Sequence, residues 1–322
     1  MNRWILATAL VVSIFAAAFL RTVPGCPFCS PVSATFTENI IAMDAVIIGR
    51  LEVLPGQSKA ESEPGRKDTA EATFSIVKVL KGEKVLGKLR MVQAEPFGDF
   101  KKGDHFLIVG IEPPDLIWST PVLLNDRQRD YLGSLLQLPK EGAQRLAFFQ
   151  NYLEDPDSML ASDAFDEFAR ADYSTLKELS PKMHHDQLVY WIKDPNVPVD
   201  HRRLYLTMLG VCGGANDIPM LEAFLRGEGP RAKSGLDALV ACYLTLRGPT
   251  GVAKIEELFL RNCASQLDDQ YADIYMAIAA LRFHGTEGDV VPRDRVLEAY
   301  RLVLATPETA ELVVSDFARW QD

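Results

Sequence analysis

The chain has few cysteines and no sequence signature of a common enzyme class. It contains no G-x-S-x-G, P-loop or G-x-G-x-x-G motif, so nothing predicts an activated serine, a phosphate-binding loop or a dinucleotide site. The five cysteines stand at positions 26, 29, 212, 242 and 263, too few and too scattered for a disulfide-rich scaffold. We therefore predict no catalytic residues and no cofactor, and expect a protein that is not an enzyme.

Long blocks of basic residues are also lacking. The formal net charge is -10, and it becomes about -12 if Arg3 and Arg21 are removed with an N-terminal leader. An acidic surface repels the phosphate backbone of DNA and RNA. We therefore expect no nucleic acid among the partners.

The N-terminus carries the one long apolar run in the sequence. Arg3 precedes Trp4 to Leu20, an uncharged stretch that is long for a signal peptide and short for a membrane span of about 20 residues. Small residues at Ala16–Ala18 and at Gly25 offer cleavage sites. Residues 1–25 are predicted to be a signal peptide or an N-terminal membrane anchor. The protein is then periplasmic, extracellular or membrane-anchored, and touches a membrane only through this segment.

Cys26 and Cys29 form a C-x-x-C pair directly after that segment. In an oxidising compartment the pair could form a structural disulfide or tether, exchange disulfides with a partner, hold a metal, or carry a lipid on Cys26. Attachment of a c-type haem needs a histidine where Ser30 stands, and zinc would need a second ligand pair that the other cysteines do not provide. We predict no metal site, and favour a disulfide or tether, with thiol exchange left as an alternative.

Residues 26–122 are rich in short strand patterns. A capping box, Thr35-x-x-Glu38, predicts a short helix first. Alternating or apolar runs then predict strands at 45–54, 72–80, 88–94 and 106–111, with glycine-bearing turns between them. Several short strands in fewer than a hundred residues are typical of a small antiparallel barrel or sandwich.

Four short motifs in this region suggest a family. They are Cys26-Pro27-Phe28-Cys29, Asp44-Ala45-Val46-Ile47-Ile48-Gly49, Phe74-Ser75-Ile76-Val77-Lys78-Val79-Leu80-Lys81-Gly82 and Lys102-Gly103-Asp104-His105-Phe106-Leu107-Ile108-Val109. In this order they resemble the OB-fold module of netrins and tissue metalloproteinase inhibitors. The resemblance implies an OB-like barrel, and it implies that a free N-terminal Cys26 would chelate the zinc of a target protease. The family's internal cysteines have no counterpart between Cys29 and Cys212.

The second part of the chain, 123–322, is predicted to be helical. A helix is expected from Asn125 or Asp126 to Leu136, and another from Pro139 to Tyr152. Three copies of an apolar helix end recur at 37-residue steps, at Leu209-Gly210, Leu246-Arg247-Gly248 and Phe283-His284-Gly285. The helix pairs, at about 200–226, 236–263 and 272–304, resemble HEAT-type repeats. The predicted fold class is α+β with two domains, a small antiparallel OB-like β-barrel followed by an all-α array of HEAT-like helical hairpins.

The histidine pair His184-His185 is the remaining candidate for chemistry. It lies at a predicted helix start and lacks the H-x-x-x-H spacing of a metal site, so we expect solvated or capping side chains.

Helical repeat arrays usually present extended concave surfaces to other proteins. The expected function is therefore an exported or membrane-anchored, non-enzymatic binding or scaffold protein whose protein partner docks on the helical array. Two alternatives stay open, a thiol-disulfide oxidoreductase that uses Cys26 and Cys29, and a module similar to the metalloprotease inhibitors.

Overall fold

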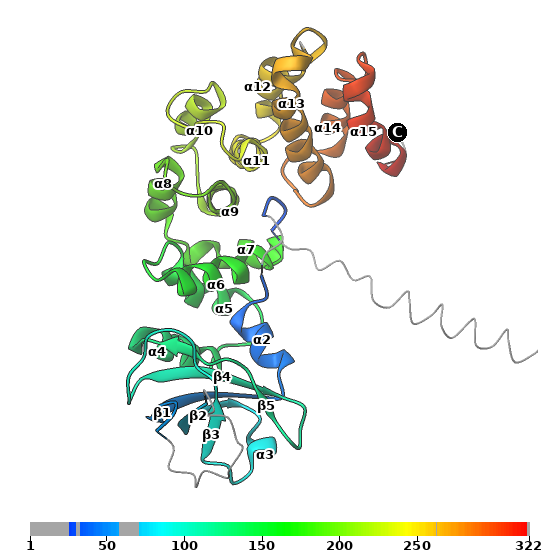
Figure 1. Ribbon diagram of the computed structural model, residues 1–322. Helices are drawn as coiled ribbons and strands as arrows, with labels where there is room; N and C mark the ends of the chain where they lie inside the picture. Colours follow the sequence, from blue (N-terminus) through cyan, green and yellow to red (C-terminus); the bar gives the residue numbers. More distant parts are fainter. Residues whose placement is uncertain (1–25, 30–32, 58–70, 262, 321–322) are drawn as a thin grey trace, which may run out of the picture. The chain divides into compact units, whose positions relative to one another are not determined.

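The computed structural model describes residues 26–29, 33–57, 71–261 and 263–320. Contacts divide the chain into two compact units. One is formed by Val32–Glu167, and the other by Phe168–Asp322 together with the described residues 26–29. The chain thus has the predicted α+β, two-part fold, with an antiparallel β-barrel followed by an array of helices (Figure 1).

The first unit is built around a nearly closed, barrel-like antiparallel sheet. Its strands run in the order β3-β2-β1-β4-β5, and β6 pairs with β4. Their bounds are β1 Ala45–Val53, β2 Ala72–Lys81, β3 Met91–Ala94, β4 His105–Ile111, β5 Ile117–Trp118 and β6 Val122–Leu124. The four predicted strands are confirmed, while β5 and β6 are too short to produce an alternating sequence pattern.

The core of this sheet is aromatic and aliphatic. Phe74 on β2 and Phe106 on β4 are fully buried and meet edge to face with ring centroids 5.2 Å apart. Strand β1 lies between β2 and β4, and Gly49 on β1 leaves room for the side chains of the two neighbouring strands. A Cβ atom at Gly49 would stand 2.9 Å from Cδ1 of Ile108 and 3.1 Å from Cβ of Phe74. A side chain at position 49 would therefore force the two neighbouring strands apart.

Helices complete the first unit. They are α2 Phe36–Ala42, α3 Glu83–Leu86, α4 Asp126–Leu135, α5 Ala143–Phe149, the 3-10 turn η1 Gln150–Tyr152, and α6 Ser158–Ala169, whose last two residues belong to the second unit. The capping box of Thr35 and Glu38 at the start of α2 is confirmed, and Asn125 caps α4 through a second box with Gln128. Helix α5 begins at Ala143, later than the predicted start at Pro139.

This unit continues past residue 122, the predicted end of the β module. The reason lies in buried polar contacts that join α5 and α6 to the segment before β1. Asp163 on α6 accepts a hydrogen bond from the backbone N–H of Phe36 at 2.6 Å, and Nη2 of Arg145 on α5 donates to the hydroxyl of Thr37 at 2.7 Å. Because α2 leads directly into β1, these bonds tie α5 and α6 to the sheet.

The second unit is an array of helices. It contains α7 Tyr173–Leu179, η2 Ser180–Lys182, α8 His185–Lys193, α9 Val199–Cys212, α10 Ile218–Leu225, α11 Leu236–Arg247, η3 Pro249–Gly251, α12 Val252–Ile255, the π-helical turn η4 Glu256–Leu260, α13 Cys263–Thr286, α14 Arg293–Arg301 and α15 Pro307–Trp320. The pairs α9 with α10, α11 with α12 and η4, and α13 with α14 fall on the three predicted repeats.

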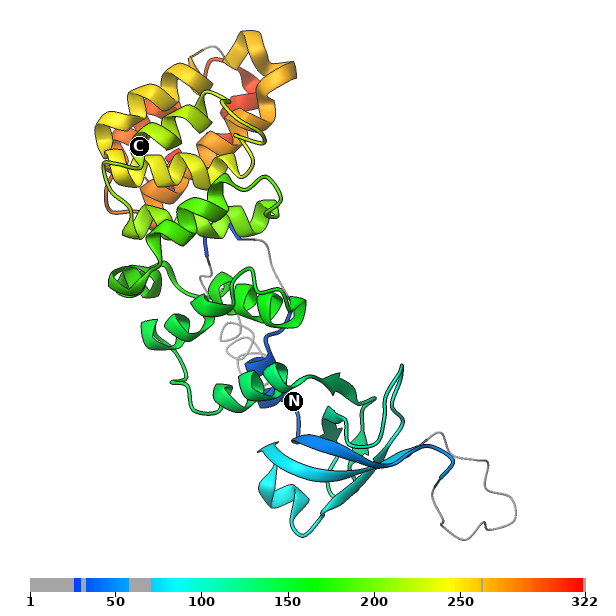
Figure 2. The same cartoon turned by 90° about the vertical axis from the view of Figure 1, so that its left-hand side faces the viewer.

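The first helices of the three pairs, α9, α11 and α13, lie side by side in Figures 1 and 2. Helix α11 is the middle one, and it is buried without interruption from Ala238 to Leu244. Gly210 lets α9 approach it, because a Cβ there would already stand 3.4 Å from the Cα of Cys242. A helix that is apolar on all sides needs neighbours on both sides, and this explains why the pairs stack.

Across the described part of the chain, no helix combines the length and the apolar character that crossing a bilayer requires. The predicted leader or anchor, residues 1–25, lies outside the described residues.

Candidate functional site

The C-x-x-C pair is a disulfide. Cys26 and Cys29 are joined, with their Cα atoms 5.3 Å apart, and the backbone N–H of Cys29 donates to the carbonyl of Cys26 at 3.2 Å. The backbone N–H of Cys26 donates in turn to the carbonyl of Ala169 at 2.8 Å, which fixes one end of the loop to the end of α6. Cys26 is 5% exposed, whereas Cys29 is partly exposed.

Phe28 anchors the middle of this loop in the helical array. Its ring is 9% exposed and meets Phe283 of α13 edge to face, with centroids 5.3 Å apart. Phe283 also meets Tyr173 of α7 edge to face at 5.0 Å. Burial of a phenylalanine contributes about 1.5–3 kcal/mol, and a ring pair of this geometry adds about 0.5–1.5 kcal/mol. The short disulfide loop is therefore an integral part of the packing of the second unit.

A cavity of about 500 Å³ lies beside the loop. Pro27, Phe28 and Cys29 form one wall, and residues of α9, α11 and α13 form the others. Tyr275 of α13 lines it and is 50% exposed, which leaves an aromatic face open to solvent. Aromatic side chains of this kind often anchor protein interfaces.

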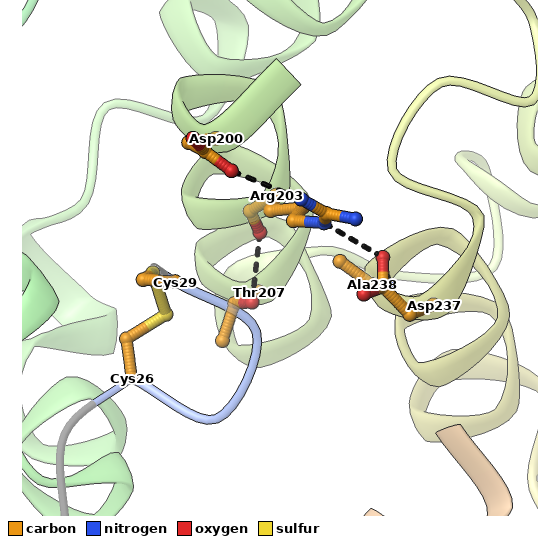
Figure 3. The surroundings of a disulfide bond; sticks show 7 residues. All are labelled: Cys26, Cys29, Asp200, Arg203, Thr207, Asp237 and Ala238. Carbon is orange, nitrogen blue, oxygen red and sulfur yellow. Dashed lines mark hydrogen bonds and ion pairs between the residues drawn. A yellow bond between two sulfur atoms is a disulfide. The ribbon is translucent and has the colours of Figure 1, made fainter. Parts of the chain in front are cut away.

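The charged groups of the cavity are largely paired within the protein. Arg203 of α9 donates from Nε to Asp237 of α11 at 2.9 Å and from Nη1 to Asp200 at 2.9 Å (Figure 3). Burial alone would lower the pKa of Arg203, but the two carboxylates raise it above its ordinary value. Asp200 and Asp237 are one 37-residue step apart, so Arg203 links equivalent positions of successive repeats.

A second arginine of the cavity is held in the same way. Arg282 of α13 donates from Nε to the buried carboxylate of Asp316 on α15 at 2.7 Å, and from Nη2 to the carbonyl of Leu312 at 2.6 Å. These ion pairs hold both arginines in the walls, and Glu287, whose pKa is raised by burial, also lines the cavity.

The surroundings of Cys26 and Cys29 offer little that would activate a thiol for disulfide exchange. Reactive cysteines of exchange enzymes usually stand at a helix N-terminus, where the dipole lowers the pKa of the thiol. Residues 26–29 form a turn, and α2, the first helix that the structure describes, begins only at Phe36. Elsewhere burial raises the pKa of the Cys212 thiol to about 11 and that of Cys242 well above its ordinary value, so both are poor nucleophiles. Within the described ranges, no three His, Cys, Asp or Glu side chains are grouped to hold a metal ion.

The structure gives the histidine pair two different positions. His184 is the N-cap residue of α8, while His185 is held between two carboxylates. Its Nδ1 lies 3.0 Å from Asp186 and its Nε2 lies 3.1 Å from both oxygens of Asp217. No local sequence pattern indicates the contact with Asp217, which is 32 residues away. With both ring nitrogens occupied, His185 links α8 to the start of α10 and is not placed as a general base.

A comparison of the chain with known protein families, with curated proteins and with solved structures finds no match. The function of the chain therefore has to be inferred from its own residues.

Proposed function

We propose that this chain is an exported or membrane-anchored, non-enzymatic binding protein that docks a protein partner on its helical array. One observation carries the proposal. The cavity beside the Cys26–Cys29 loop joins three stacked helices, its arginines Arg203 and Arg282 are neutralised within the protein, and Tyr275 stays half exposed. An open aromatic side chain on a rigid, charge-paired wall is suited to binding rather than to bond making or breaking.

The resemblance of the helices to HEAT-type repeats and of the barrel to an OB-like module supports this binding function. The bond between Arg203 and Asp237 joins neighbouring repeats, as expected for a HEAT-type array, which typically binds proteins. The barrel of the first unit is in keeping with an OB-like module of the netrin and metalloproteinase-inhibitor type. Export is supported by Arg3 and the apolar run that follows it, and the net charge of -10 disfavours nucleic acid as the partner.

Thiol-disulfide exchange is the second candidate function, because Cys29 is partly exposed at the rim of the cavity. It predicts a thiol that is ionised at neutral pH once the disulfide is reduced. After gentle reduction, rapid labelling of Cys29 by iodoacetamide at pH 7 would support this activity, and no labelling would exclude it. The inhibitor-like function is disfavoured, since the backbone nitrogen of Cys26, which would have to bind a target's zinc, donates to Ala169.

A photocrosslinking amino acid at position 275 tests the binding function directly. Expressed in its native host, the Tyr275 variant is expected to form a discrete crosslinked species. The matched control is Tyr190 on α8, a tyrosine that is 63% exposed and lies outside the cavity. A discrete adduct from position 275 and none from position 190 supports the proposal. Equal adducts from both positions, or none from either, would contradict it.

A further inference from the structure

A second cavity, of about 280 Å³, lies between α8, α9, α10 and the segment before α11. Most of its lining is apolar, and includes Ile192, Val197, Met220 and Phe224. It shares no residue with the cavity beside the disulfide loop. Its volume is near the lower end of the range of about 300–1,000 Å³ that small-molecule pockets occupy.

Arg202 of α9 places a buried positive charge in the wall of this cavity. The side chain is 4% exposed, and the acceptors that it meets among the described residues are backbone carbonyls. Nε donates to Ile192 at 3.0 Å, and Nη1 and Nη2 both donate to Ala232 at 3.1 Å. Among the described residues Nη2 finds only that one acceptor, which leaves its second N–H group for a ligand.

The other buried arginine of the described chain shows what Arg202 lacks. Arg145 is 7% exposed and forms a two-point ion pair with Glu167, at 2.6 and 3.0 Å. No carboxylate in the described part of the chain pairs with Arg202, and its guanidinium stacks over the ring of Phe224 at 5.0 Å. Burial and the nearby charge of Arg231 lower the pKa of Arg202 to about 10. A buried charge that no counter-ion balances is costly, and an incoming anion would offset that cost.

The rim of the cavity adds further positive charge. Lys193 and Arg231 line it and are exposed. Arg231 donates from Nη1 to the carbonyl of Pro195 at 2.6 Å, which keeps it at the mouth. Asp194 is the single carboxylate in the lining, and its Oδ1 already accepts from the backbone N–H of Asn196. Three basic side chains around one cavity stand out in a chain whose net charge is -10.

We propose that this cavity binds a small monocarboxylate with an apolar body. The carboxylate would accept hydrogen bonds from Arg202 and Arg231, and the apolar part would lie against Met220 and Phe224. A cavity of about 150 Å³ is enough to hold benzene, so this one has room for a ring with a carboxylate attached. The protein would then bind a small molecule in this cavity and a protein partner at the cavity beside the disulfide loop. The two proposals can be tested separately, because the two cavities share no residue.

Titration calorimetry of the full chain with benzoate at pH 7, with benzamide as its neutral isostere, tests the proposal. We expect benzoate to bind at least about tenfold more tightly than benzamide, and to bind more weakly as salt is added. Equal binding of the two compounds overturns the proposal. So does the absence of benzoate binding up to about 10 mM, a concentration at which even a weak specific site would be filled.

Two variants locate the site. Met220→Trp fills the cavity and is expected to abolish benzoate binding, and Arg231→Gln is expected to weaken it about three- to tenfold. Arg319→Gln, an exposed arginine on α15 outside the cavity, is the matched charge control and should leave the affinity unchanged. Retained binding in a folded Met220→Trp protein would place the ligand elsewhere. If that variant does not fold, Arg231→Gln decides, since an unchanged affinity there overturns the proposal.

Discussion

The ring of Phe28 packs edge to face on that of Phe283, across more than 250 residues of sequence, with 5.3 Å between the ring centroids. Through this contact the short segment that follows the predicted leader becomes part of the helical unit. Phe28 lies between the two linked cysteines. The disulfide therefore restricts the position of the ring, and the packing of the ring on Phe283 holds the disulfide loop against α13.

Replacing Phe28 by alanine is expected to destabilise the helical unit by about 2–4 kcal/mol, because it removes a buried ring and leaves a void beside Phe283. Chemical denaturation followed by circular dichroism at the helix signal measures the loss. Tyr190→Ala, which removes an exposed ring from α8, is the control and should change stability by less than about 0.5 kcal/mol. A Phe28→Ala protein as stable as the control would show that the loop adds nothing to the packing.

Reduction of Cys26–Cys29, or the double change to serine, is expected to cost the helical unit about 2 kcal/mol. The estimate follows from the loop-closure entropy of so short a ring. Since the disulfide and Phe28 act on the same loop, combining the two changes should cost clearly less than the sum of the separate losses. A double-mutant cycle measured by denaturation checks this, and strict additivity would mean that the disulfide does not position Phe28.

His185 is expected to make the stability of the helical unit depend on pH. Hydrogen bonds to Asp186 and Asp217 raise its pKa, so the folded state favours the charged imidazolium. This contribution is fully present below the unfolded pKa of about 6.5 and is lost as pH rises through the higher folded pKa. Because the side chain is partly exposed, the effect should not exceed about 1 kcal/mol. An NMR titration of His185 measures the pKa, and His185→Gln should remove this part of the pH dependence.

Much of the fold could be predicted because it depends on local patterns. The capping boxes at Thr35 and Asn125 mark helix starts by side chains three residues apart, and the 37-residue step marks the helix pairs. Strand β5 cannot be predicted in this way, because its two residues, Ile117 and Trp118, are too few to show an alternating pattern. Local signals of this kind also indicated the disulfide.

The candidate sites depend on contacts that sequence spacing does not encode. Nothing near Phe28 indicates Phe283, and nothing in the pair Arg202-Arg203 indicates that one side chain meets only carbonyls while the other meets two carboxylates. The two side chains meet different partners because adjacent residues on a helix point in directions about 100° apart around the helix axis. The sequence could in principle indicate that Asp200 and Asp237 are equivalent positions, because they are separated by the 37-residue repeat.

Asp163 is expected to make the first unit less stable as pH rises through the acid range, which is the opposite of the usual effect of a surface carboxylate. Burial raises its pKa to about 6, although the hydroxyl of Tyr131, at 2.6 Å, and the backbone N–H of Phe36 both donate to it and oppose that rise. The folded state therefore holds a proton that the unfolded chain, with an ordinary pKa near 3.8, has released. Stability should fall as pH rises from about 4 to 6, by at most about 3 kcal/mol.

The variant Asp163→Asn tests this, because the amide keeps an acceptor for Phe36 and cannot titrate. Denaturation of wild type and variant at several pH values between 4 and 7, followed by circular dichroism, should show the slope in the wild type alone. If both proteins show the same slope, another group is responsible.

The ion pair between Arg145 and Glu167 is expected to be the most sensitive polar contact of the first unit. Both side chains are about nine-tenths buried, and Arg145 also donates to Thr37 and to the carbonyl of Pro139. Glu167→Gln removes the carboxylate that is hydrogen-bonded to the guanidinium and should cost about 3–5 kcal/mol. The double change Arg145→Met with Glu167→Leu removes both charges and is expected to recover most of that loss, because the desolvation cost disappears with them. Thermal unfolding of the single and double variants distinguishes the two effects, and a double variant less stable than Glu167→Gln would show that the pair itself holds α5 and α6 together.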